Sequence, residues 1–120
     1  MQQDYIMKEI SKFSQMLLRI ATRLGLLDDS VTPPENVPES FSAELEENLG
    51  ISPEELLGMD SPMEYLVSVK EFDPQDLETL ATLLLKVWPD SEEVESFRKE
   101  VTGYLDSLGM YSFSLHSYEI

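Results

Sequence analysis

The chain has 120 residues, of which 24 are Asp or Glu and 8 are Lys or Arg, so its formal net charge is −16. This length fits one ordinary domain, and 42% hydrophobic residues are too many for a disordered acidic tail. The charge argues against nucleic acid and against an anionic membrane as partners. The absence of cysteine excludes disulfides, thiolate metal sites and cysteine nucleophiles.

Charged residues interrupt the apolar residues near the start of the sequence, so we expect no signal-peptide core there. The longest apolar run is Leu83-Leu84-Leu85, far below the roughly 20 residues of a membrane span. The sequence therefore predicts a cytoplasmic protein, and the lack of cysteine fits a reducing compartment.

Residues 6–27 carry a heptad pattern, which predicts a helix of roughly 35 Å. Its apolar positions are Ile6, Ile10, Phe13, Leu17, Ile20, Leu24 and Leu27, flanked by Met7, Met16 and Ala21. The stripe is broader than a strict coiled-coil seam, which favours packing within the same chain. A dimer seam is the alternative, so we expect a monomer or a homodimer.

Four basic residues lie on the opposite face of this predicted helix: Lys8, Lys12, Arg19 and Arg23. They form a basic stripe that holds half of all the positive charge. We favour a solvated outer face, and the alternative is a surface that binds phosphate or an acidic partner. Like charges four residues apart are mildly unfavourable unless acidic residues lie near them.

The adjacent prolines Pro33 and Pro34 predict a non-helical connection at residues 28–35. A helix then resumes near residue 38 or 40, because Phe41, Leu45 and Leu49 lie one turn apart. Gly50 follows as its predicted end.

Three similar helix starts come next: Ser52-Pro53, Ser61-Pro62 and Asp73-Pro74, each with an acid three residues after the cap. Proline suits the first helical position, and the acid can reach back to the N–H of the cap residue. The close spacing predicts that the first two of these helices are short. Capping explains the Ser-Pro pairs better than phosphorylation does.

The apolar pattern of residues 74–88 predicts a helix that is apolar over most of its circumference. Such a helix should lie in the middle of the fold. Pro89 ends it, and Ser91 caps a last helix that stops near Gly109. The predicted core face of this last helix is Val94, Phe97, Val101, Tyr104, Leu105 and Leu108. On its outer side we expect a Glu95–Lys99 pair.

Residues 110–120 alternate apolar and polar side chains, with Tyr111 and Phe113 among the apolar ones. A strand that pairs with a partner is one interpretation, but we favour a docked or disordered tail, because one strand cannot form a sheet alone. The predicted organisation is one all-α domain at residues 1–109, followed by this tail. The domain should hold five or six helices in stacked antiparallel hairpins.

The sequence offers little catalytic chemistry, so we expect no enzyme, no cofactor and no metal site. His116 is the only histidine and lies in the predicted tail, which leaves no zinc ligand set and no convincing catalytic triad. Paired carboxylates are so frequent that each pair carries little information. No calcium loop and no glycine-rich phosphate loop occurs.

Several short motifs resemble a family of short, uncharacterised bacterial proteins with tetratricopeptide-repeat-like helical folds. They are Gln3-Asp4-Tyr5-Ile6-Met7 with Ile10, Leu49-Gly50-Ile51-Ser52, Glu55-Leu56-Leu57, Met63-Glu64-Tyr65-Leu66 and the leucine-rich helix from Leu77 to Val87. The resemblance covers residues 1–109. It implies a long first helix, a second helix, a short leucine-rich pair and a final hairpin. The prolines at residues 28–40 depart from the family, and the family implies no activity.

The leading functional hypothesis is a non-catalytic protein-interaction module that binds a protein or peptide on a helical groove. Candidate contact residues are the basic stripe (Lys8, Lys12, Arg19 and Arg23) for acidic ligands, and Tyr111 and Phe113 if the tail is recognised by a partner or docks on its own domain. The alternative is an acidic inhibitor, an immunity-type protein or a secretion chaperone that meets a basic partner. Its acidic face would lie at residues 28–64, because eleven acids and no base separate Arg23 from Lys70.

Overall fold

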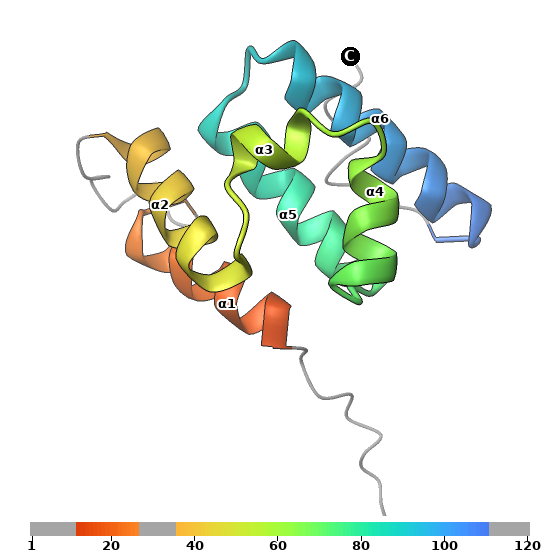
Figure 1. Cartoon of the computed structure of the whole chain (residues 1–120), viewed down its shortest axis with the longest axis horizontal. Helices are drawn as coiled ribbons and strands as arrows, with labels where there is room; N and C mark the ends of the chain where they lie inside the picture. The colour runs from red at the N-terminus through yellow and green to blue at the C-terminus, as the bar shows by residue number, and fades with distance from the viewer. Residues whose placement is uncertain (1–11, 27–35, 111–120) are drawn as a thin grey trace, which may run out of the picture.

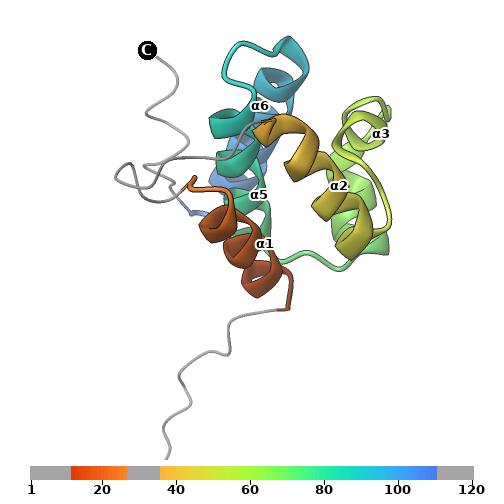
Figure 2. The ribbon, with the colours of Figure 1, turned by 90° about the vertical axis from the view of Figure 1, so that its left-hand side faces the viewer.

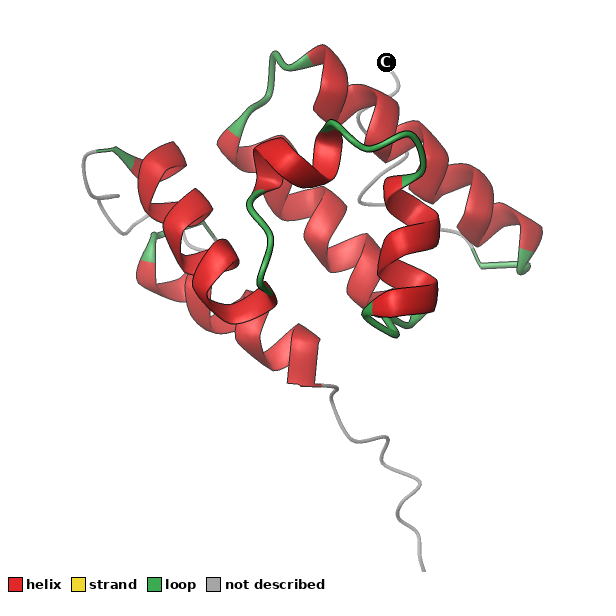
Figure 3. Ribbon diagram, viewed as in Figure 1, coloured by secondary structure: helices red, strands yellow, loops and turns green. Residues whose placement is uncertain are grey.

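The computed structural model of the chain describes residues 12–26 and 36–110. Within these ranges all regular secondary structure is helical, which confirms the all-α class (Figure 1; Figure 3). The described residues hold six α-helices, the higher of the two predicted numbers. The helices are α1 (Lys12–Arg23), α2 (Val37–Leu49), α3 (Pro53–Leu57), α4 (Pro62–Glu64), α5 (Pro74–Val87) and α6 (Glu92–Ser107). A π-helical stretch, η1 (Tyr65–Val69), continues α4 directly.

Two pairs of neighbouring helices form the body of the fold. Helices α5 and α6 pack against each other and run in opposite directions, and α1 and α2 do the same (Figure 1). Helix α1 also packs on α5, which joins the two pairs (Figure 2). The short helices α3 and α4 both lie against α6, and α3 also contacts α2.

Helix α5 is the centre of the core, as its apolar circumference predicted. Eight of its fourteen residues are buried, and Leu77, Leu80 and Leu84 have no solvent exposure. Fully burying one such side chain stabilises a fold by about 1.5–3 kcal/mol. Trp88 follows as the C-terminal cap, and Pro89 comes next in the sequence.

The part of the predicted heptad stripe that the structure describes is core of the same chain. Leu17, Ile20 and Leu24 are buried, as are the flanking residues Met16 and Ala21. Phe13 is half-buried and stacks on Phe72 in a tilted arrangement, with ring centroids 4.6 Å apart. The remaining stripe residues, Ile6, Ile10 and Leu27, lie outside the described residues.

Two of the three predicted helix starts have the expected capping geometry. The Ser52 hydroxyl and the Asp73 carboxylate each accept a hydrogen bond from the backbone N–H three residues on. In return, the acid at that third position, Glu55 or Asp76, accepts a hydrogen bond from the N–H of the cap residue. The prediction is wrong in detail at Ser61, whose side chain makes no cap hydrogen bond. Its backbone angles, φ −135° and ψ 74°, are not those of the extended caps at Ser52 and Asp73.

The ends of α2 and α6 follow the predicted glycines, with one correction. Gly50 and Gly109 both have positive φ, which a side chain would disfavour. Leu108, predicted to lie on the core face, is instead 49% exposed. Helix α6 ends at Ser107, so the helical periodicity that would turn Leu108 inward no longer holds.

Candidate functional site: an apolar groove rimmed by carboxylates

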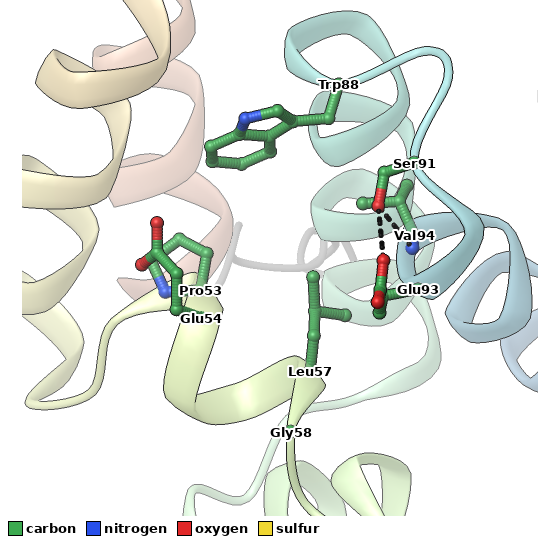
Figure 4. A pocket seen from close by; sticks show the side chains of 8 residues that line it. All are labelled: Pro53, Glu54, Leu57, Gly58, Trp88, Ser91, Glu93 and Val94. Carbon is green, nitrogen blue, oxygen red and sulfur yellow. Dashed lines mark hydrogen bonds between the residues drawn. The ribbon is translucent and has the colours of Figure 1, made fainter.

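A pocket of about 330 Å³ lies between α3 and the connection from α5 to α6. We call it the Trp88 groove (Figure 4). Its lining residues are Pro53, Glu54, Leu57 and Gly58 on one side and Trp88, Ser91, Glu93 and Val94 on the other. The two sides come from segments that are separated in the sequence by α4, η1 and α5, and the tertiary fold brings them together.

Local sequence signals set the α3 side of the groove. Pro53 stands at the first position of the helix, after the Ser52 capping box, and is buried together with Leu56. Since neighbouring residues on a helix point in different directions, burying Leu56 leaves Leu57 half-buried at the groove. Gly58 ends the helix.

The indole of Trp88 covers the opposite side. The backbone N–H of Trp88 donates to the Leu84 carbonyl at 2.8 Å, which fixes the backbone of Trp88 to the last turn of α5. The indole meets the ring of Phe41 edge-on, with centroids 5.9 Å apart, and stays half-buried. In Figure 4 the indole and Leu57 lie on opposite sides of the groove. The sequence predicted Trp88 only as part of an apolar helix surface and not as a groove residue.

Two carboxylates flank the apolar part of the groove, Glu54 from α3 and Glu93 from the first turn of α6 (Figure 4). The Ser42 hydroxyl donates to Glu54 Oε2 at 3.3 Å, and the Ser91 hydroxyl donates to Glu93 Oε1 at 3.2 Å. Ser91 also accepts from the Val94 N–H as the cap of α6. Within residues 12–26 and 36–110, the ion pairs involve neither Glu54 nor Glu93.

The structure describes half of the predicted basic stripe with its side chains, and these do not lie near the groove. Arg19 and Arg23 are exposed on α1, beside Leu18, which is 39% exposed. Arg23 pairs with Glu44 of α2 at 2.9 Å, so an acid from the next helix offsets its charge. The side chain of Lys12 lies outside the described part, and so does Lys8.

The other predicted contact residues, Tyr111 and Phe113, also lie outside the described residues, as does His116. The extended or disordered tail therefore stays a prediction.

Sequence reasoning missed two polar contacts made by buried side chains. The Ser14 hydroxyl donates to Asp76 Oδ1 at 2.6 Å and joins α1 to the start of α5, while Asp76 Oδ2 accepts from the Asp73 N–H. Asp76 carries the sequence signal of a capping acid, but nothing in the sequence points to Ser14.

The second contact is on α6, where the buried Arg98, only 2% exposed, binds the partly exposed Glu95 through two hydrogen bonds of 3.0 and 2.6 Å. The hydrogen-bonded partner of Glu95 is thus Arg98 and not the predicted Lys99. Hydrogen bonding from Arg98 holds the pKa of Glu95 below its ordinary value. The positive charges of Arg98 and Lys99 lower this pKa further, while partial burial of the carboxylate opposes the shift.

In the part of the chain that the structure describes, no group of three or more His, Asp or Glu side chains is arranged to hold a metal ion. No helix there is long and apolar enough to cross a membrane. Comparison with family models, with curated proteins and with solved structures found no match in any of the three. The groove's own geometry is therefore the basis for a functional conclusion.

Proposed function

We propose that the protein is a non-catalytic interaction module that binds a segment of another protein in the Trp88 groove. The observation that carries this proposal is a half-buried tryptophan facing a half-buried leucine across an open apolar pocket. Tryptophans in such positions dominate the energetics of many protein interfaces. A volume of about 330 Å³ is at the lower end for small-molecule sites, so it suits one or two side chains.

The wider architecture fits the same proposal. Helical hairpins that stack leave concave surfaces, which is how repeat-like folds bind their partners. We propose that the α1–α2 and α5–α6 pairs are such hairpins and that the chain is related to the tetratricopeptide-repeat-like bacterial family named above. The cytoplasmic location and the absence of catalysis are parts of this proposal.

A second candidate function is binding of a basic partner by the acidic surface, as an inhibitor, immunity protein or secretion chaperone would do. It is favoured by the exposed acids on α2 and α3, of which Glu46, Glu47 and Glu55 are examples. Association of this kind is fast and weakens with salt, because it depends on long-range attraction. The basic stripe is a third candidate, as a site for acidic ligands; both Arg19 and Arg23 are exposed there, and Arg23 also pairs with Glu44.

A matched pair of leucine variants tests the leading proposal. A photo-crosslinking residue at position 57 is used to capture a partner, which is then purified. Leu57→Arg should weaken its binding at least tenfold, because the new side chain fills the groove. Leu108→Arg, an equally large change at an exposed leucine outside the groove, should leave the affinity unchanged. Equal affinity of both variants and the parent chain would contradict the proposal.

Salt separates the two candidates. Binding dominated by the groove should weaken only modestly when salt is raised, because much of its contact is apolar, whereas binding dominated by the many charges of the acidic surface should weaken steeply.

A further inference from the structure

We propose that the side chain which enters the Trp88 groove is that of an arginine or a lysine of the partner protein. Its aliphatic stem lies between Trp88 and Leu57, and its cationic head lies at Glu54 and Glu93. This inference rests on the proposed function, because it names the guest of the same groove.

The apolar lining matches the stem of a long basic side chain. Arginine and lysine bury their methylene groups along apolar surfaces and keep the charged head near water. Leu57 and Trp88, both half-buried, supply such a surface in a pocket that is open to solvent, and the buried side chains of Pro53 and Val94 lie behind it. The indole of Trp88 adds an aromatic face, which attracts a cation placed over it.

The rim is the feature that selects a basic guest over an apolar one. Glu54 and Glu93 lie on opposite sides of the groove (Figure 4), and within residues 12–26 and 36–110 each accepts a side-chain hydrogen bond on one carboxylate oxygen. A carboxylate has room for about four hydrogen bonds, so both retain capacity for a donor. An apolar guest would take water from these charges without replacing it, whereas a cation compensates that loss.

The positive charges of the described helices do not fill this role. Among residues 12–26 and 36–110, no lysine or arginine lines the groove, and the ion pairs at Arg23 and Arg98 use Glu44 and Glu95. Serine hydroxyls position the two rim carboxylates without neutralising them. The groove therefore offers negative charge beside an aromatic face, which is complementary to a guanidinium or an ammonium. Arginine should bind more tightly than lysine, since its planar head can stack on the indole and bind a carboxylate through two N–H groups.

Trp88 is the only tryptophan, so its fluorescence reports on the groove directly. The probes are blocked pentapeptides in which one central residue, set among glycines and serines, is arginine, lysine, citrulline or norleucine. Citrulline keeps the shape of arginine without its charge. At low salt the arginine peptide should bind about fivefold or more tightly than the citrulline and norleucine peptides.

Charge-removing variants locate the preference. Glu54→Gln and Glu93→Gln should each reduce the advantage of arginine over citrulline by about threefold. Glu92→Gln removes the same charge from the neighbouring position of α6, outside the groove lining, and should leave that advantage unchanged. Thermal melting of each variant checks that the fold is intact.

Equal binding of the arginine and norleucine peptides, or no Trp88 response to arginine up to tens of millimolar, would overturn this inference. The proposed function would still stand in that case if Leu57→Arg disrupts binding of the purified partner. It fails separately if Leu57→Arg and Leu108→Arg bind that partner equally well.

Discussion

The α5–α6 hairpin and the stretch from α3 to η1 are held in different ways, and the Trp88 groove lies between them. Helices α5 and α6 have 14 and 16 residues and bury eight and six of them. Helices α3 and α4 have five and three residues, and each buries at most two. Isolated helices this short are unstable in water, so α3 depends on its cap and on a few anchors such as Leu56.

The comparison shows that the groove has one wall built into the core and one wall set by local contacts. Trp88 is fixed to the last turn of α5 and to Phe41. Leu57 and Glu54 stand on a helix whose start is defined by the Ser52 capping box. Substitutions in the hairpin should therefore change global stability, and substitutions in α3 should change the groove first.

The largest effect is expected in the hairpin, at Leu84, which has no solvent exposure. Leu84→Ala should lower the free energy of unfolding by about 2–5 kcal/mol, because it removes buried methyl groups and leaves a cavity. Urea denaturation followed by circular dichroism measures this change. Leu57→Ala is the control at the groove and should cost clearly less. Equal losses at Leu84 and Leu57 would contradict the claim that the Trp88 side of the groove belongs to the core and the α3 side depends on local contacts.

A smaller loss is expected at the buried contact between α1 and α5. Asp76→Ala should lower the free energy of unfolding by about 1–3 kcal/mol, because it leaves the Ser14 hydroxyl and the Asp73 N–H without this acceptor. Denaturant unfolding is again the measurement. Stability equal to that of the parent chain would mean that the contact does not hold α1 in place.

The two Ser-Pro helix starts provide a matched test of the local wall. Ser52→Ala should cost about 1 kcal/mol, because the hydroxyl caps α3. Ser61→Ala should cost much less, since that side chain makes no cap hydrogen bond. Hydrogen exchange of the α3 amides and Trp88 fluorescence should respond to the first substitution alone. If both variants lose equal stability, the difference between the two caps is not real.

The smallest effect concerns Glu95, whose pKa Arg98 holds below its ordinary value of 4.5. A lowered pKa in the folded state means that this contribution to stability is present above pH 4.5 and is lost as the pH falls through the folded value. Because the Glu95 side chain is 40% exposed, solvent screening keeps the contribution small. Thermal melting between pH 6 and pH 3 should show a slightly shallower loss for Glu95→Gln than for the parent chain.

Glu100→Gln is the control for this pH series, because Glu100 lies on the same helix and forms no ion pair among the described residues. Its melting profile should keep the slope of the parent chain. Identical profiles for Glu95→Gln and Glu100→Gln would show that Arg98 has no influence on the titration of Glu95.

Features with a local cause were predictable from the sequence. The caps at Ser52 and Asp73, the end of α2 at Gly50 and the central position of α5 follow from short-range patterns, and the structure confirms them. Ser61 shows the limit: it has the same motif, but its backbone is not in the extended conformation of the other two caps and its side chain makes no cap hydrogen bond.

Features that need the tertiary fold were not predictable. The contact from Ser14 to Asp76 spans 62 residues, and no pattern in the sequence relates the two. The groove likewise joins Leu57 to Trp88 across three helical segments, so neither residue stands out in the sequence alone. Glu95 was predicted to pair four residues along the helix, but it binds the buried Arg98 one residue earlier.

The most direct test of the central claim is to map chemical-shift changes in the ¹⁵N-labelled chain as the purified, crosslinking-identified partner is added. The account predicts the largest changes at the Trp88 indole N–H and at the backbone amides of Leu57, Gly58 and Val94. Largest changes around Leu18 and Arg19 on α1, with the Trp88 groove unaffected, would contradict it.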